Sequence, residues 1–148
     1  MMTAENYQQQ WSAILTGLAG EVALLPRDER LWMTTRLARI GRLQRRLHRL
    51  FLAAGGPELC RLCQGGCCGC GRNHLTLVNL LSFLLADEAP PAFDFSRTCP
   101  YNSDSGCLLE PSRRPFNCVI FLCDEVETAL SPSERQLFGA LERRLKSL

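Results

Sequence analysis

The sequence predicts a small, mainly α domain whose middle segment is irregular, rich in cysteine and organised by a bound metal. Three observations predict this fold class. Apolar residues recur at helical spacing at both ends of the chain, all nine cysteines fall between Cys60 and Cys123, and glycine and proline interrupt that stretch. A chain of 148 residues, 46% of them hydrophobic, fits a single domain spanning residues 1–148 with its own apolar core.

The first segment, residues 1–56, should form two helices joined by a short turn, which favours an antiparallel helical hairpin. In the first helix, apolar residues lie at helical spacing and Gly20 is the expected stop. In the second helix, Pro26 suits the first turn, and the helix should end near Gly55. Its apolar stripe consists of Leu37, Ile40, Leu43, Leu47, Leu50 and Phe51.

Arginine occupies the other faces of this second helix. Residues 27–49 hold eight arginines against Asp28 and Glu29, although the net charge of the whole chain is only +2. One helical face is shared by Arg39, Arg42, Arg46 and Arg49. Two interpretations stay open: a solvated face, or a surface that docks an acidic protein or RNA. The scarcity of lysine and aromatic residues nearby weakens the nucleic-acid interpretation.

The middle segment, residues 57–124, should be mostly loop with one short helix. Thr76 can cap this helix, and leucines follow at helical spacing until Pro90 and Pro91 end it. Loop is expected over residues 87–118, where turn-forming residues are frequent, so this stretch should bury little apolar area. We therefore expect bound metal to contribute much of its order.

The last segment, residues 131–148, should be a single helix. Ser131 is the expected cap, Pro132 suits the first position, and Glu134 completes a capping box. The predicted buried face consists of Leu137, Leu141 and Leu145.

Cysteine is densest in the string CRLCQGGCCGC at residues 60–70. A C-x2-C spacing at a tight turn brings two sulfurs onto one metal, and adjacent glycines let backbone N–H groups approach sulfur. Thiols this dense among glycines indicate metal ligation rather than inert buried cysteine. The predicted metal ligands are Cys60, Cys63, Cys67, Cys68, Cys99, Cys107, Cys118 and Cys123, with Cys70 left out.

Three other polar residues near these motifs have open roles. His74 either ligates metal or borders the short helix, and His48 is expected at the surface of the arginine-rich helix. Arg114, which precedes Pro115, either packs against the cysteines and offsets thiolate charge or lies exposed in a turn.

The order of the cysteine motifs is specific enough to compare with a known family. The string C-x2-C-x3-CC is followed by Cys99-Pro100, Gly106-Cys107 and Arg114-Pro115-Phe116-Asn117-Cys118. This order resembles the zinc- or iron-chelating cysteine-cluster family, also called YkgJ-type or CxxCxxCC. The resemblance covers residues 60–123 and implies bound zinc or iron. In the flagellin lysine N-methylases, a similar cluster belongs to a protein-modifying enzyme and is a candidate for an iron–sulfur centre.

These features are compatible with three functions. The first is a metal-binding protein that holds an iron–sulfur cluster, of the 4Fe–4S type, in a structural or redox role. The second is a zinc-stabilised interaction module that docks an acidic protein or RNA through the arginine-rich helix. The third, implied by the resemblance, is an accessory or catalytic part of a protein lysine methylase-like system. The sequence displays no substrate site, so it leaves enzymatic activity open.

The cysteine usage and the apolar runs also predict a compartment. The longest apolar run, Leu75–Ala86, is interrupted by polar residues and short of the roughly 20 residues of a membrane span. The N-terminus shows no basic stretch followed by an apolar one. We therefore expect a cytoplasmic protein without a membrane segment, where thiols stay reduced and available to metal. A secreted disulfide scaffold would leave one of nine thiols over.

Overall fold

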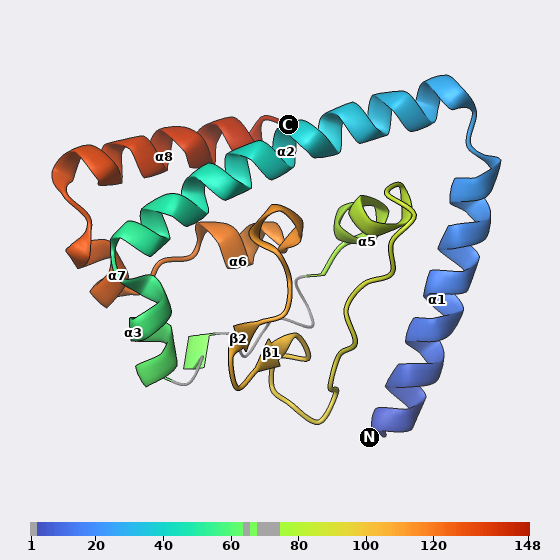
Figure 1. The fold of residues 1–148 in the computed structure, drawn as a ribbon, viewed down its shortest axis with the longest axis horizontal. Helices are drawn as coiled ribbons and strands as arrows, with labels where there is room; N and C mark the ends of the chain where they lie inside the picture. The colour runs from blue at the N-terminus through green and yellow to red at the C-terminus, as the bar shows by residue number, and fades with distance from the viewer. Residues whose placement is uncertain (1–2, 64–65, 68–74) are drawn as a thin grey trace.

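The computed structural model describes residues 3–63, 66–67 and 75–148, and it confirms a mainly helical fold (Figure 1). The three long helices are α1 (Ala4–Leu24), α2 (Arg27–Ala53) and α8 (Pro132–Lys146). The shorter elements are α3 (Gly56–Leu62), α5 (Leu77–Leu84), β1 (Asn102–Ser103), β2 (Gly106–Cys107), the 3-10 turn η2 (Pro111–Arg113), α6 (Phe116–Ile120) and α7 (Asp124–Ala129). No helix in this part of the chain is long and apolar enough to cross a membrane.

The sequence predicts that the first helix stops at Gly20, but the helix continues to Leu24. Its last turn is held by Val22, which is buried and whose carbonyl accepts a hydrogen bond from Arg30 Nη2 at 3.0 Å. The helix ends where Pro26 forces Leu25 into an extended conformation. A proline thus ends this helix, and the glycine is tolerated inside it.

The expected antiparallel pairing of α1 with α2 is replaced by a corner (Figure 1). Leu25 and Pro26 are both extended, so the link turns the chain without reversing it. Helix α1 then contacts α5. Its Tyr7 and Trp11 rings lie 5.3 Å and 5.2 Å from Phe95 and Phe93, in the loop after α5. These aromatic contacts bury apolar area that a hairpin with α2 would leave in water.

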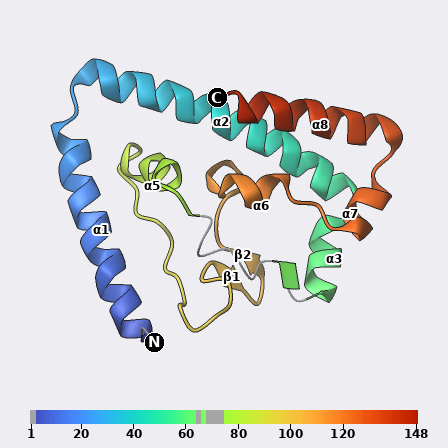
Figure 2. The ribbon, with the colours of Figure 1, turned by 180° about the vertical axis from the view of Figure 1, so that it is seen from behind.

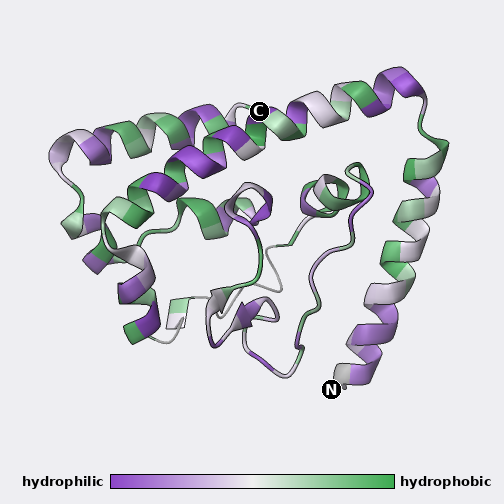
Figure 3. Ribbon diagram, in the orientation of Figure 1, coloured by the Kyte–Doolittle hydropathy of each residue, from purple (hydrophilic) through white to green (hydrophobic). Residues whose placement is uncertain are grey.

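The antiparallel partner of α2 is instead α8, as both views show (Figures 1 and 2). Along both helices hydrophobic and hydrophilic residues alternate, as expected for helices with one buried face (Figure 3). The shared core consists of Leu43, Leu47, Phe138, Leu141 and Leu145. Two of the three residues predicted for the buried face of α8 are confirmed, whereas Leu137 is 42% exposed. Phe138, one position on, takes its place.

Both predicted helix caps are present. Ser131 Oγ accepts a hydrogen bond from the Glu134 N–H at 3.3 Å, and a Glu134 carboxylate oxygen accepts one from the Ser131 N–H at 2.8 Å. At the start of α5, Thr76 forms a capping box with Asn79. These signals are local in sequence, which is why they could be recognised there.

The middle segment contains more regular structure than predicted. Helix α3 follows Gly55, whose positive φ of 72° ends α2. Helix α6 contains Cys118 of the last cysteine motif, and α7 begins directly after Cys123. Within the stretch of frequent turn-forming residues lies a small hairpin in which Asn102 pairs with Cys107. Next to it, Tyr101 and Leu109 are buried against Phe83 of α5. The hairpin is thus anchored on α5 by its flanking residues.

The 3-10 turn η2 packs closely on the middle of α2. Gly41 makes this approach feasible, because a Cβ atom at that position would lie 3.2 Å from Cβ of Ser112. The chain leaves η2 at Arg114 and enters α6 after Pro115. We call this short connection, residues 111–115, the strap. It joins the segment that carries Cys107 to the helix that carries Cys118.

Candidate metal centre

Seven of the predicted ligands lie in the described part of the chain. They come from six places: Cys60 and Cys63 at the end of α3, Cys67 in a short turn, Cys99 before the hairpin, Cys107 on β2, Cys118 on α6 and Cys123 as the N-cap of α7. Cys68, the remaining predicted ligand, lies outside the described residues, as do Cys70 and His74.

A first group of thiols surrounds Cys60. Helix α3 contacts both α7 and β2, which brings Cys60 close to segments more than forty positions away in sequence. Burial raises the pKa of the Cys60 thiol to about 11, and the charges of Cys67, Cys63 and Cys123 add to the rise. Cys63 also donates its S–H to the Cys60 carbonyl, at 3.5 Å. Each of the other three thiols is therefore close enough to Cys60 for ionised sulfurs to repel.

A second group surrounds Cys118. This residue keeps exposed surface, yet protein packed around its sulfur raises the pKa of its thiol to about 11. The charges of Cys107 and Cys99 add to the rise, followed by that of Cys67. Cys67 thus belongs to both groups. The two groups are neighbours, and together they include every thiol that the structure describes.

Apolar packing holds the outermost members of the two groups. Cys99 packs against the buried cluster of Phe83, Tyr101 and Leu109. Cys123 packs against the cluster that contains Val126 and Leu130. Each of these two thiols is half-buried, so the core covers only part of its surface. Among the described residues, no three His, Cys, Asp or Glu side chains already stand in an arrangement that would hold a metal ion.

Arg114 lies between the two groups. Its positive charge opposes the rise in pKa of both Cys60 and Cys118. Its Nε donates to the Leu109 carbonyl at 2.9 Å, and its own carbonyl accepts a hydrogen bond from Gln44 Nε2 at 2.8 Å. Of the two roles that the sequence left open for Arg114, this position favours packing against the cysteines.

His48 was expected at the surface, but it is half-buried beside Arg114. Its ring stacks on Phe51 with centroids 5.5 Å apart, and its Nδ1 lies 3.5 Å from Arg114 Nη1. Since a guanidinium can only donate, Nδ1 is the acceptor in this contact. Burial lowers the pKa of His48, and the charge of Arg114 lowers it further. The sequence signal that could have placed His48 is its i, i+3 spacing to Phe51.

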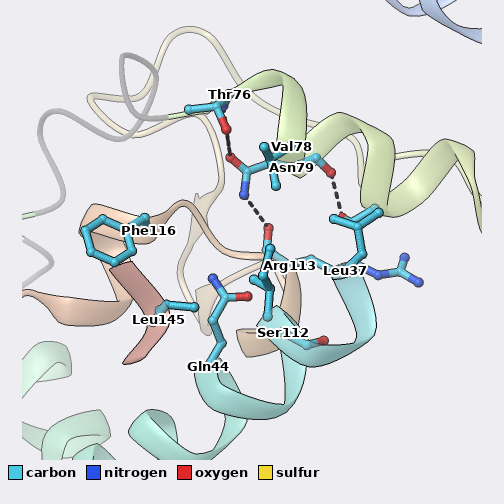
Figure 4. Close-up of a pocket in the computed structure, with 11 residues that line it drawn as sticks. Leu37, Gln44, Thr76, Val78, Asn79, Ser112, Arg113, Phe116 and Leu145 are labelled. Atoms are coloured by element: carbon cyan, nitrogen blue, oxygen red, sulfur yellow. Dashed lines mark hydrogen bonds between the residues drawn. The ribbon is translucent and has the colours of Figure 1, made fainter. Parts of the chain in front are cut away.

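Gln44 is a second residue that sequence reasoning missed. It lies on the apolar face of α2, and only 3% of its surface is exposed. A small cavity of about 160 Å³ is lined by Gln44, by Asn79 of α5 and by Ser112 and Arg113 of the strap (Figure 4). Both amides donate to backbone carbonyls of the strap. The side chains of Gln44 and Asn79 therefore hold the backbone of the strap in place.

The arginine face of α2 lies on the surface of the molecule. Arg39, Arg42, Arg46 and Arg49 are exposed. Within the described residues they form no salt bridge, whereas Arg45 lies 3.9 Å from Glu110. In the single chain, this arginine face is therefore exposed to solvent.

Comparisons of the chain with family models, with curated proteins and with solved structures gave no match.

Proposed function

We propose that this chain binds a metal group through its cysteines, and that the group is an iron–sulfur cluster, of the 4Fe–4S type, in a structural or redox role. The observation that carries the proposal is that thiols from distant segments raise one another's pKa. The charge of Cys123 raises the pKa of Cys60, and the charge of Cys67 raises the pKa of Cys118. Thiolates gathered in this way repel one another, and a bound metal is the usual source of compensating charge.

The donor set fits an iron–sulfur cluster, and it fits a four-thiolate zinc site equally well. The group that surrounds Cys60 and Cys118 is built of thiols, and Fe–S clusters take cysteine thiolates as their regular ligands. The described histidine near the site, His48, turns its Nδ1 to Arg114. The preference for iron comes from the resemblance, because a similar cluster in the flagellin lysine N-methylases is a candidate for an iron–sulfur centre.

The residues that would hold the cluster come from both thiol groups. They are Cys60, Cys63, Cys67 or Cys68, Cys107 and Cys118, with Cys99 and Cys123 as further candidates. When bound, the cluster would supply one-electron transfer or a cross-link between segments. The chain itself contributes thiolates, the apolar packing behind them and the charge of Arg114. We expect the cytoplasm as the compartment, because thiols stay reduced there.

Visible spectroscopy of protein purified without oxygen tests which metal is present. An iron–sulfur protein is brown, and dithionite bleaches its broad visible absorption, whereas a zinc protein is colourless. We expect the brown form, with iron and acid-labile sulfide in equal amounts. A colourless protein that contains stoichiometric zinc would contradict the iron–sulfur proposal and leave thiol ligation standing.

A second candidate function is a zinc-stabilised module that docks an acidic partner. The observation that favours it is the exposed arginine face, whose four guanidinium groups have no salt bridge in the described part of the chain. An acidic protein surface or RNA would complement it. Reversal of Arg42, Arg46 and Arg49 to glutamate should abolish salt-sensitive binding of an RNA or acidic-protein probe. Equal binding by the reversed variant would contradict this candidate.

A further inference from the structure

We propose that Arg114 is a fixed counter-cation for the thiolate groups and determines how tightly the site binds a thiolate-ligated metal. This inference rests on the proposed metal-binding function, and it goes beyond that function by giving one non-ligating residue a positioning and charge role.

The backbone of the strap is held from both sides. Asn79 Nδ2 donates to the Arg113 carbonyl at 3.3 Å (Figure 4), and Gln44 Nε2 donates to the Arg114 carbonyl at 2.8 Å. Both amides are buried, and they come from two different helices, α5 and α2. Two consecutive carbonyls with buried partners leave this backbone little freedom to move.

The guanidinium of Arg114 is held as well. Its Nε is bound to the carbonyl of Leu109, two residues after Cys107, and its Nη1 is beside His48 of α2. The His48 ring stacks on Phe51, and Phe51 lies against Gly56, where α3 begins on its way to Cys60. The chain itself reaches Cys118 four residues after Arg114. The cation is therefore fixed between the segments that carry these three cysteines.

The neighbouring arginine is held in a different place. Both Nη atoms of Arg113 bind the carboxylate of Glu88, at 2.6 and 2.9 Å, and its guanidinium lies 4.5 Å from the centre of the Phe83 ring. Its charge is thus already paired, on the α5 side of the strap. Two adjacent residues of the same type have separate partners, which makes Arg113 a matched control for Arg114.

A cation at this position matters because the thiolate ligands carry more negative charge than the metal ion carries positive charge. Four thiolates around one divalent ion leave a net charge of about −2. A guanidinium that is already in place favours this charge without having to move when the metal arrives. Its loss should therefore weaken metal binding by about ten- to a hundredfold, the range seen when outer partners of metal ligands are removed.

Titration of the reduced, metal-free full chain with Co²⁺ under anaerobic conditions tests this inference, with the thiolate-to-cobalt absorption as readout. We expect Arg114→Gln to weaken Co²⁺ binding by about ten- to a hundredfold. Arg114→Lys keeps the positive charge but loses the several N–H donors of the guanidinium. It should therefore bind Co²⁺ more tightly than Arg114→Gln and less tightly than the wild type. Arg113→Gln should lower thermal stability through its lost pairing with Glu88 and leave the affinity for Co²⁺ unchanged.

Three outcomes would overturn the inference. Wild-type affinity in Arg114→Gln would show that the cation has no part in binding. An equal loss in Arg113→Gln would assign the effect to the general integrity of the strap, and so would a failure of Arg114→Lys to bind better than Arg114→Gln. A wild-type chain that takes up no Co²⁺, Zn²⁺ or iron would contradict the proposed function itself, which makes that failure distinguishable from the other three.

Discussion

His48 and Arg114 are the two residues whose roles depend most on each other. Nδ1 of His48 accepts from a group that always carries a positive charge, and the ring is half-buried. Protonation of His48 would place two cations about 3.5 Å apart. The neutral imidazole is therefore the form that the folded chain selects, which agrees with the lowered pKa.

Removal of the neighbouring cation should partly restore the ordinary titration of His48. In Arg114→Gln we expect the pKa of His48 to rise toward 6.5, while burial keeps it somewhat below that value. NMR titration of the imidazole protons in both proteins measures this. An unchanged pKa in the variant would show that Arg114 does not influence the ring.

The lowered pKa of His48 also determines how the stability of the fold changes with pH. Between the lowered pKa and 6.5, the unfolded chain binds more protons at His48 than the folded chain does. The contribution of neutral His48 to stability is therefore complete above pH 6.5. It is lost as the pH falls through the lowered pKa.

Sequence reasoning could find the thiols and could not find the residues that support them. Cysteine motifs are recognisable because their spacing has chemical meaning. Gln44 and His48 lie on a helix full of polar residues, and their burial depends on the strap, which is about seventy positions away. Arg114 was recognised as a candidate because it adjoins the last cysteine motif.

Among the elements, those with local signals were predicted well. The caps at Thr76 and Ser131 rest on contacts between residues three positions apart, so the sequence around them is sufficient. The course of α1 depends on Phe93 and Phe95, which are far away in sequence. The short helices α3, α6 and α7 have five to seven residues each, too few for a periodic pattern to reveal them.

The packing of α2 against α8 should be the main source of stability outside the cysteine region. Leu47 is fully buried in this core. We expect Leu47→Ala to lower the free energy of unfolding by about 2–5 kcal/mol, because it leaves a cavity that the two helices cannot close. Urea denaturation followed by circular dichroism measures the change.

The matched control is Leu24→Ala, which removes the same atoms from a side chain that is 81% exposed. It should change the free energy of unfolding by no more than about 0.5 kcal/mol. Equal effects of the two substitutions would mean that α2 and α8 do not form a common core around Leu47.

At the scale of the whole molecule, the thiol groups connect segments that lie far apart in the sequence. Helix α3, the hairpin strand β2 and α6 each carry a predicted ligand, and each is short. A metal bound by Cys60, Cys107 and Cys118 would link all three. Metal binding should therefore order this half of the molecule more than it orders α2 and α8.

Metal uptake should release protons. The thiols of Cys60 and Cys118 have pKa values of about 11, so both are protonated near neutral pH in the metal-free chain. Each should release about one proton when it binds metal as thiolate. Calorimetric titration with Zn²⁺ in two buffers of different ionisation enthalpy counts these protons. Cys60→Ser should release one fewer, and uptake without proton release would contradict ligation by these thiols.

The most direct test of convergence compares metal content across single cysteine variants of the full chain, purified without oxygen and analysed for iron, sulfide and zinc. Cys60→Ser and Cys118→Ser probe the two thiol groups, and Cys70→Ser, at a cysteine not predicted to be a ligand, is the control. We predict iron and sulfide in the wild type and in Cys70→Ser, with a strong loss in both other variants. A wild-type protein that is metal-free yet equally well folded, or whose cysteines are joined in disulfides, would contradict the account.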